Sequence, residues 1–292
     1  LIVGDVMLDK YYFGKVDRIS PEAPVPIVNI QKEESRLGGA SNVANNIVSL
    51  GGHSLLCGVI GHDLFGKEIE RISRHKNIDT FLLKTSSPTI TKARIIGGKQ
   101  QIVRVDYEDK SELNADNKKL FRDTISRILP EYDILVISDY GKGLISEDLC
   151  RYLIKLAHKY DKKVIIDPKG KNWEKYSGAD IVTPNVKELS DIVGYTVPNT
   201  DRAIEKAARE AITNNHLTAL LVTRSDKGMS LIGPIPPIHI PTHSEEVFDV
   251  SGAGDTVVAT LGLCLAAGFE ISEAMRTANI AAGIVVKKVG TA

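Results

Sequence analysis

Short apolar runs recur along the 292-residue chain, and most of them are closed by a polar residue. Continuous runs of this kind are typical of strands in a parallel sheet, because helices cover both of its faces. Helices are predicted between the runs at about 146–159, 185–193 and 201–214, and two more at about 253–268 and 272–288. This alternation predicts an α/β fold with a central, mostly parallel sheet flanked by helices. The runs are Leu1–Val3, Leu55–Ile60, Asp133–Ser138, Lys163–Asp167, Asp180–Thr183 and Ala219–Thr223.

Two segments, about 10–37 and 88–107, break the alternation and are predicted to be β structure. The first holds three prolines between Pro21 and Pro26, which exclude a helix there. The second consists of two β-type segments, one on either side of a glycine pair at 97–98, and this arrangement predicts a hairpin. We expect a single domain over 1–292, in which these segments form a small β-sheet lid over a ligand crevice at the strand ends.

Composition narrows the possible partners. The chain has 37 basic and 37 acidic side chains, so its charge gives no general reason to bind nucleic acid or an anionic membrane. Its longest apolar stretch, Val257–Phe269, is too short to cross a bilayer, and no signal peptide opens it. Isolated cysteines without a CxxC pair predict reduced core residues in a cytoplasmic protein. They are Cys57, Cys150 and Cys264. Both ends are abrupt, so we expect residues to be missing there.

The most informative motif is Phe-Asp-Val-Ser-Gly-Ala-Gly-Asp-Thr at 248–256, directly before an apolar helix. Gly252 and Gly254 allow close approach of the backbone, and the N–H groups at a helix start suit a phosphate. Asp255 would repel a phosphate that is merely bound, but it could take the proton of a hydroxyl acceptor during phosphoryl transfer. The alternative is a glycine-rich turn with an acid that complements the helix dipole.

Two other motifs also precede helices. Gly38-Gly39, with Asn42 in the first turn, could form a sugar-binding turn or simply a tightly packed helix entry. Asn185 and Glu188 could hold the water shell of a magnesium ion. They could equally form an N-cap with an acid three residues on, which is the favoured interpretation when this motif is taken alone.

Polar residues at strand ends supply further candidates. Asp5 and Asp9 flank the end of the first strand, where carboxylates could bind sugar hydroxyls or act as turn acids. Lys169 follows another acidic strand end and offers a phosphate contact. The Thr223–Gly228 strand end is a plausible neighbour of a nucleotide.

The glycine and asparagine motifs occur in one order, and together they resemble the ribokinase family of sugar kinases, also called the PfkB family, over essentially the whole chain. The segments are Gly38–Asn42, Asn185–Glu188 and Asp249–Asp255. Others look like the D-glycero-β-D-manno-heptose-7-phosphate kinase branch, namely Gly4–Asp9, Arg18–Pro26, Pro88–Arg94 and Ile137–Gly143. That branch phosphorylates the anomeric 1-hydroxyl on the route to the nucleotide-activated heptose of lipopolysaccharide. In many relatives a cytidylyltransferase-type domain follows, and this chain stops before one.

The resemblance implies a ribokinase-like fold and a role for each matching residue. Asp255 would be the general base, and the N–H groups from Ser251 through Gly252 and Ala253 to Gly254 would form the anion hole. Ser251 stands where many members have Thr, and we expect little effect. Asn185 and Glu188 would organise Mg²⁺, through water, and phosphate. The sugar hydroxyls would meet Asp5, Asp9, Gly39 and Asn42, and the ATP side would hold Thr223, Ser225, Gly228 and Asn279.

The 7-phosphate needs cations, and Lys92, Arg94 and Arg104 on the lid are the candidates, because arginine suits phosphate geometry. The alternative is a solvated lid face. The family also suggests a homodimer in which the lids pair, and some relatives need a monovalent cation. Two other functions stay open: a PfkB-family kinase for ribose, a fructose phosphate or a nucleoside, and a sugar-binding sensor without catalysis. Asp255 argues against the sensor, since a pure binder does not need that acid.

Overall fold

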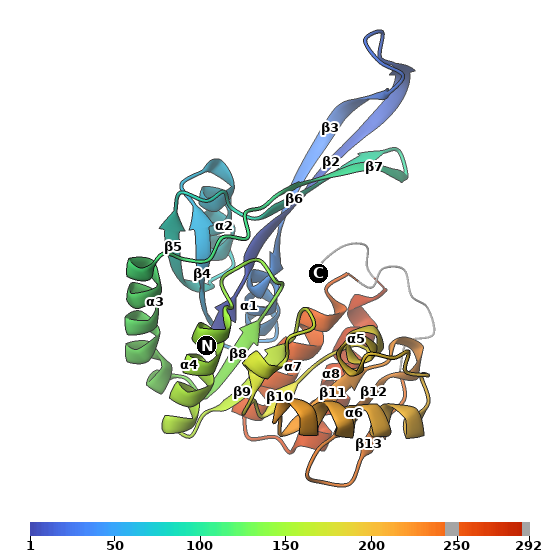
Figure 1. Ribbon diagram of the computed structural model, residues 1–292. Coiled ribbons are helices and arrows are strands. Elements are labelled where there is room, and N and C mark those ends of the chain that lie inside the picture. Colours follow the sequence, from blue (N-terminus) through green and yellow to red (C-terminus); the bar gives the residue numbers. More distant parts are fainter. Residues whose placement is uncertain (243–250, 288–292) are drawn as a thin grey trace.

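The computed structural model describes residues 1–242 and 251–287 (Figure 1). The beginning of the glycine-rich motif, 248–250, therefore lies outside the described residues, as does residue 288, the predicted end of the last helix.

A nine-stranded sheet forms the centre of the molecule, in the order β13-β12-β11-β10-β9-β8-β1-β4-β5. Its strands pair in parallel from β5 to β11, whereas β12 and β13 are antiparallel. The predicted, mostly parallel sheet is thus confirmed. The strands are β1 (Ile2–Gly4), β4 (Leu55–Gly61), β5 (Asp79–Thr85), β8 (Ile134–Ser138), β9 (Lys163–Asp167), β10 (Ile181–Val182), β11 (Ala219–Thr223), β12 (Met229–Ile232) and β13 (Ile238–Ile240).

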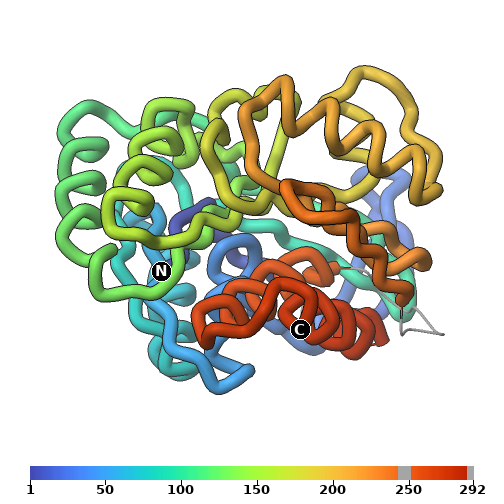
Figure 2. The backbone as a smooth tube through the Cα atoms, turned by 90° about the horizontal axis from the view of Figure 1, so that it is seen from below, coloured from blue at the N-terminus to red at the C-terminus, as the bar shows by residue number. Residues whose placement is uncertain are grey.

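Helices cover both faces of this large sheet, as Figure 2 shows: α7 and α8 lie on one side, and the helices from α3 to α6 on the other. Apolar side chains from α1, α2, α7 and α8 make one buried cluster, and those from α3, α4 and α6 contribute to the second. The helices are α1 (Ala40–Ser49), α2 (Leu64–His75), α3 (Ala115–Ile128), α4 (Glu147–Lys159), α5 (Val186–Val193), α6 (Asp201–Asn215), α7 (Ala253–Ala266) and α8 (Ile271–Val285). Among the described residues, no helix combines the length and apolarity that a membrane span requires.

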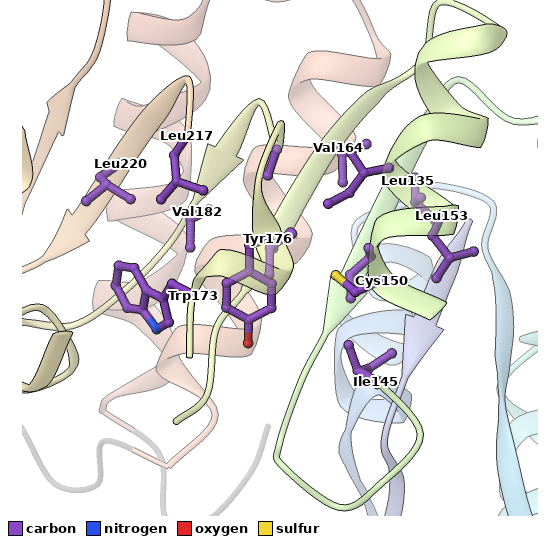
Figure 3. Close-up of a cluster of buried hydrophobic side chains, with 14 of the residues drawn as sticks. Leu135, Ile145, Cys150, Leu153, Val164, Trp173, Tyr176, Val182, Leu217 and Leu220 are labelled. Carbon is purple, nitrogen blue, oxygen red and sulfur yellow. The ribbon is translucent and has the colours of Figure 1, made fainter. Parts of the chain in front are cut away.

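The central strands are apolar along their whole length because both of their faces are covered. All five residues of β8 are buried, and Figure 3 shows the adjoining cluster, with Trp173 and Tyr176 packed among aliphatic side chains. The three cysteines are buried and free, as expected. A core of this kind fixes the strands, and with them the loops at their carboxyl ends.

A separate four-stranded sheet, in the order β3-β2-β6-β7, extends away from the body (Figure 1). The prolines predicted to exclude a helix lie at the tip of its β2–β3 ribbon, and Pro26 is the first residue of β3, a position that a strand tolerates. The predicted hairpin is present, but its turn lies one residue later than expected, at Gly98 with φ +64° and Lys99. The strands are β2 (Val6–Ile19), β3 (Pro26–Gly39), β6 (Thr91–Gly97) and β7 (Gln100–Tyr107).

Two sequence-based expectations need correction. Asp9 does not flank the end of the first strand: β1 ends at Gly4, β2 begins at Val6, and Asp9 lies inside β2 in the second sheet. The long strand was hidden because its first residues are buried like those of the central strands.

Helix α3, with the strands β5, β12 and β13, was not anticipated. The only buried residues of α3 are Phe121 and Ile125, four apart.

Candidate active site

The start of α7 forms an open, glycine-lined turn. Gly252 is the N-cap residue with φ +78°, a conformation that favours glycine, and no side chain caps the helix. Thr256 N bonds back to Gly252 O at 3.0 Å, whereas the amides before it lie at the helix start, where N–H groups lack partners within a helix. Apart from the neighbouring backbone of its own helix, a Cβ at Gly254 would meet no atom of the described residues within 4 Å. An anion can therefore approach these amides directly.

Asp255, in the first turn of α7, is only 4% exposed and is held by two donors. Asn42 Nδ2, from α1, donates to Asp255 Oδ2 at 2.8 Å. Tyr140 Oη, from the loop after β8, donates to Asp255 Oδ1 at 2.7 Å. The structure thus brings the glycine motif near residue 39 and the one near residue 252 together at one carboxylate.

The pKa of Asp255 is raised to about 6: burial is the largest cause and the charge of Asp9 adds to it, while the bonds from Asn42 and Tyr140 and the charge of Lys92 oppose the rise. A carboxylate in this range is still ionised at neutral pH, yet it is a stronger base than an exposed aspartate. That is the property a general base requires.

The glycine pair before α1 allows two close approaches. Gly39 has φ +56°, and Ala40 N donates to Asp5 O at 3.1 Å. A Cβ at Gly38 would lie 2.5 Å from Asp9 Oδ2, so only glycine leaves room for this carboxylate. Asn42 Oδ1 is buried and has no hydrogen-bond partner among the described residues. This oxygen could accept a hydrogen bond from a hydroxyl group, and the sugar-binding role expected for Asn42 stays a prediction.

Three cations gather on one face of the second sheet. Lys92 and Arg94 are two residues apart on β6, and Arg104 of β7 lies directly opposite Arg94, so all three share a face. Arg94 Nη1 donates to the buried Asp9 at 2.6 Å, whereas the exposed Arg104 makes two bonds to Asp106. The three predicted phosphate ligands are therefore neighbours, although two of them are already paired.

Asp5 supports a loop rather than pointing freely into space. Its Oδ2 accepts the backbone N–H of Tyr140 at 2.8 Å and that of Lys142 at 3.1 Å, and Oδ1 has no hydrogen-bond partner among the described residues. Burial and the nearby charge of Asp139 raise the pKa of Asp5 to about 6. These contacts fix the loop after β8, and the sugar-binding role expected for Asp5 stays a prediction.

The capping box considered for Asn185 and Glu188 is present at the start of α5. Asn185 Oδ1 accepts from Glu188 N at 2.9 Å, and Glu188 Oε2 accepts from Asn185 N at 3.1 Å. Lys169 Nζ donates to Glu188 Oε1 at 2.9 Å. This box explains the motif structurally, and it leaves the predicted metal role untested.

Asp167, at the carboxyl end of β9, adds a carboxylate that the sequence analysis did not assign. Burial raises its pKa well above the ordinary value, and the negative charges of Asp255 and Glu188 raise it further. The signal was a polar residue closing an apolar run, and only Lys169 was chosen from that strand end. Within 1–242 and 251–287, no three His, Cys, Asp or Glu side chains form a group that could hold a metal directly.

Three of the four residues expected on the ATP side lie around the end of β11. Thr223 forms an isolated parallel bridge with Asn185, so this strand end adjoins the capping box. Ser225 is exposed with φ +53°, and Gly228 has φ +78°. A Cβ at Gly228 would overlap Ile240 O, at 2.0 Å. Asn279 lies on α8, where its Nδ2 donates to Pro241 O at 2.7 Å. Thr223, Ser225 and Gly228 thus form one turn beside Asn185.

The fold matches those of solved carbohydrate kinases. Phosphofructokinase-2 from Escherichia coli in complex with potassium gives a TM-score of 0.81 at 21% identity, covering 100% of this chain and 94% of that one. Ribokinase from Arabidopsis thaliana, complexed with ribose and ATP, gives 0.76 at 20% identity, covering 99% and 92%. These likenesses define the fold class as ribokinase-like.

The model of the pfkB carbohydrate kinase family matches residues 1–292, so the chain belongs to this family. The D-beta-D-heptose 7-phosphate kinase of Bordetella bronchiseptica is 45% identical over 292 residues, covering 100% of this chain and 91% of that protein. The bifunctional protein HldE of Haemophilus influenzae strain PittEE is 46% identical over 293 residues. This chain spans 60% of the length of that relative. The resemblance drawn from the motifs is confirmed.

Proposed function

We propose that the protein transfers the γ-phosphoryl group of ATP to the anomeric 1-hydroxyl of D-glycero-β-D-manno-heptose 7-phosphate. The product would be the 1,7-bisphosphate used for ADP-heptose and lipopolysaccharide core synthesis. The observation that carries the proposal is the buried Asp255, held by two donors at the open start of α7. The relatives at 45% and 46% identity support the choice of acceptor.

In this mechanism the oxygen of the acceptor hydroxyl forms the new bond to the γ-phosphorus while the bond from that phosphorus to ADP breaks. Asp255 takes the proton that the hydroxyl loses. The amides from Ser251 to Gly254 face the charge that develops on the transferred group. Because burial raises the pKa of Asp255 to about 6, the group is ionised before the transfer at neutral pH and can hold the proton after it.

Magnesium would be held through water by Asn185 and Glu188, near the charge of Asp167. When bound, the ion would neutralise charge on the nucleotide phosphates. Lys169 is paired with Glu188, and in this proposal it would exchange that partner for a phosphate oxygen. We also propose that the protein binds a potassium-type ion, because phosphofructokinase-2, which shares the fold, was solved in complex with potassium.

The 7-phosphate would bind the shared face of Lys92, Arg94 and Arg104. Burial and the nearby cations Lys142, Arg94 and Arg104 lower the pKa of Lys92, although the charge of Asp9 opposes this. A doubly charged phosphate would relieve the repulsion among these cations. Asp9 also holds Arg94 on this face, so the phosphate would arrive at a cation that is already oriented.

The second sheet would act as a lid that excludes water from the transfer. Its outer residues include exposed apolar side chains, among them Val16, Ile19 and Val103. A homodimer that pairs two such sheets would cover them. We place the enzyme in the cytoplasm, where ATP and phosphorylated sugars are available.

The test is a coupled ADP-release assay with MgATP and D-glycero-D-manno-heptose 7-phosphate. Fructose 6-phosphate, ribose and a sample without acceptor are run beside it. Turnover with the heptose phosphate alone is the expected result. Turnover only with fructose 6-phosphate would keep the kinase chemistry and refute the heptose acceptor. Turnover only with ribose would also refute the phosphate-binding role of Lys92, Arg94 and Arg104. No turnover with any acceptor would favour a sugar-binding sensor.

A further inference from the structure

Tyr140 lies in the Ile137–Gly143 segment, to which the sequence analysis assigned no role, yet its hydroxyl donates to the carboxylate of Asp255. We propose that Tyr140 is a positioning residue, whose hydroxyl holds Asp255 in the orientation that takes the acceptor's proton. The inference rests on the proposed function, because it assumes that Asp255 is the base.

The geometry is that of a two-sided clamp. Tyr140 Oη donates to Oδ1 at 2.7 Å and Asn42 Nδ2 to Oδ2 at 2.8 Å, so rotation of the carboxylate would break both bonds. Each carboxylate oxygen can accept more than one hydrogen bond, so the acceptor hydroxyl can still reach the base. Burial and the charges of Asp255 and Asp167 raise the pKa of Tyr140 well above its ordinary value, and the phenol therefore remains a donor.

The backbone that carries Tyr140 is itself held in place. Asp5 Oδ2 accepts the N–H of Tyr140, and Gly141 N donates to Asp139 Oδ1 at 2.8 Å. Asp139 N in turn donates to Asp167 O at 3.0 Å. A Cβ at Gly143, which has φ +105°, would come within 2.8 Å of Lys110 O. The hydroxyl is therefore delivered by a fixed loop rather than by a mobile side chain on a free segment.

The phenol ring also faces the second sheet. Lys92 Nζ lies 5.5 Å from the ring centroid, a cation–π distance, so Tyr140 stands between the base and a candidate phosphate ligand. Among the described residues, charged groups that act on Asp255 include Asp9 on β2, Lys92 on β6 and Asp167 on β9. None of them replaces the hydrogen bond that Tyr140 supplies to Oδ1.

The experiment compares Tyr140→Phe with wild type and with Tyr152→Phe, which makes the same chemical change on the helix α4, beside Arg122. For Tyr140→Phe we expect kcat to fall about 10–100-fold, because a misplaced reacting group costs about this much. KM for ATP should stay within about twofold. The midpoint of the acid limb of kcat/KM should rise by about one pH unit, since a donor to the ionised carboxylate is lost. Tyr152→Phe should match wild type throughout.

Two results would overturn the role of Tyr140: an unchanged kcat, or a reduced kcat with an unmoved acid limb, which a merely structural role would produce. Asp255→Asn separates this proposal from the proposed function. If wild type turns over, Asp255→Asn does not, and Tyr140→Phe is unchanged, only the role of Tyr140 fails. If wild type turns over no acceptor, or Asp255→Asn remains fully active, both proposals fail.

Discussion

The two sheets of this protein are built on opposite principles. All five residues of β8 in the large sheet are buried, whereas seven of the eight residues of β7 in the second sheet are exposed. The large sheet is covered by helices on both faces, and the second extends from the body with one face carrying cations (Figure 1). The large sheet and the helices that cover it, called the frame below, fix the positions of side chains. The second sheet is instead a surface that presents charge.

In the proposed mechanism this division corresponds to two kinds of chemistry. Proton transfer needs a base placed to within a fraction of an ångström, and Asp255 is anchored to elements of the packed frame. Recognition of a phosphate tolerates more freedom and benefits from accessible cations. The following predictions test whether the two functions are as separate as the two sheets.

The largest effect is expected at the base. Asp255→Asn should reduce kcat roughly 10²–10⁴-fold while ATP still binds, because only proton removal is lost. Coupled ADP release and calorimetric titration with ATP measure the two quantities. Asp191→Asn, the same change at an exposed position of α5, serves as the control. Near wild-type turnover in Asp255→Asn would contradict the assignment.

The frame should be sensitive to lost packing. Phe121 is fully buried on α3, with its ring 5.7 Å from that of Phe81 on β5. Phe121→Ala should lower the free energy of unfolding by about 3–5 kcal/mol, measured by urea denaturation. Phe269→Ala, at a residue 49% exposed, is the matched control and should change it by less than about 0.5 kcal/mol. Equal losses in the two variants would show that α3 is not part of the frame.

The buried base should also cost stability in a pH-dependent way. The pKa of Asp255 rises from 3.8 to about 6 on folding, so the folded state holds the proton more tightly. The contribution of Asp255 to wild-type stability is therefore lost as the pH rises from about 4 to about 6, whereas the side chain that replaces it in Asp255→Asn does not titrate. The difference in unfolding free energy, variant minus wild type, should therefore be about 3 kcal/mol larger at neutral pH than at acidic pH. Urea denaturation at several pH values measures this gap, and a constant gap would refute the raised pKa.

The cationic face should affect the acceptor and not the nucleotide. Arg94→Ala should raise KM for the phosphorylated sugar about 10–100-fold, as expected for a lost charge-assisted bond, and leave KM for ATP unchanged. Lys92→Ala and Arg104→Ala are tested singly in the same assay. Arg71→Ala on α2, an exposed arginine paired with Glu68, is the control. If none of the three raises KM for the sugar, the phosphate binds elsewhere.

The smallest effect is expected on the exposed part of the second sheet. Val103 is 45% exposed, so Val103→Thr should change the unfolding free energy by less than about 0.5 kcal/mol. Val136→Thr in β8 would bury a hydroxyl and should cost about 1–3 kcal/mol. A large, concentration-dependent loss in Val103→Thr would show that a second copy covers this face, and light scattering would detect the dimer directly.

The fold could be predicted wherever a buried element consists of consecutive apolar residues. The central strands are continuous apolar runs, and the glycine motifs mark helix starts where the backbone must turn sharply. The start of β2 was missed because its buried residues imitate a central strand, although Asp9 belongs to the second sheet. Helix α3 was missed because Phe121 and Ile125 are its only buried residues.

The site was predictable to the extent that its residues lie in local motifs. Asp255 and Asn42 were chosen from separate motifs, and the structure joins them through one hydrogen bond. Tyr140 lies in the Ile137–Gly143 segment, but its role could not be read from that segment, because its contact with Asp255 spans 115 residues and depends on how β8 and α7 pack. Asp167 carried only the weak signal of an acid at a strand end.

The ribbon formed by β2 and β3 also constrains how chain length can vary in evolution. Its base is in strict register, with Val6 opposite Gly39 and Asp9 opposite Arg36, and α1 follows directly. One residue inserted there would reverse the faces of Asp9 and its neighbours and displace the start of the helix that carries Asn42. At the tip, around 20–25, an insertion would lengthen only the turn. Homologous chains should therefore differ in length at the tip of this ribbon and keep its base constant.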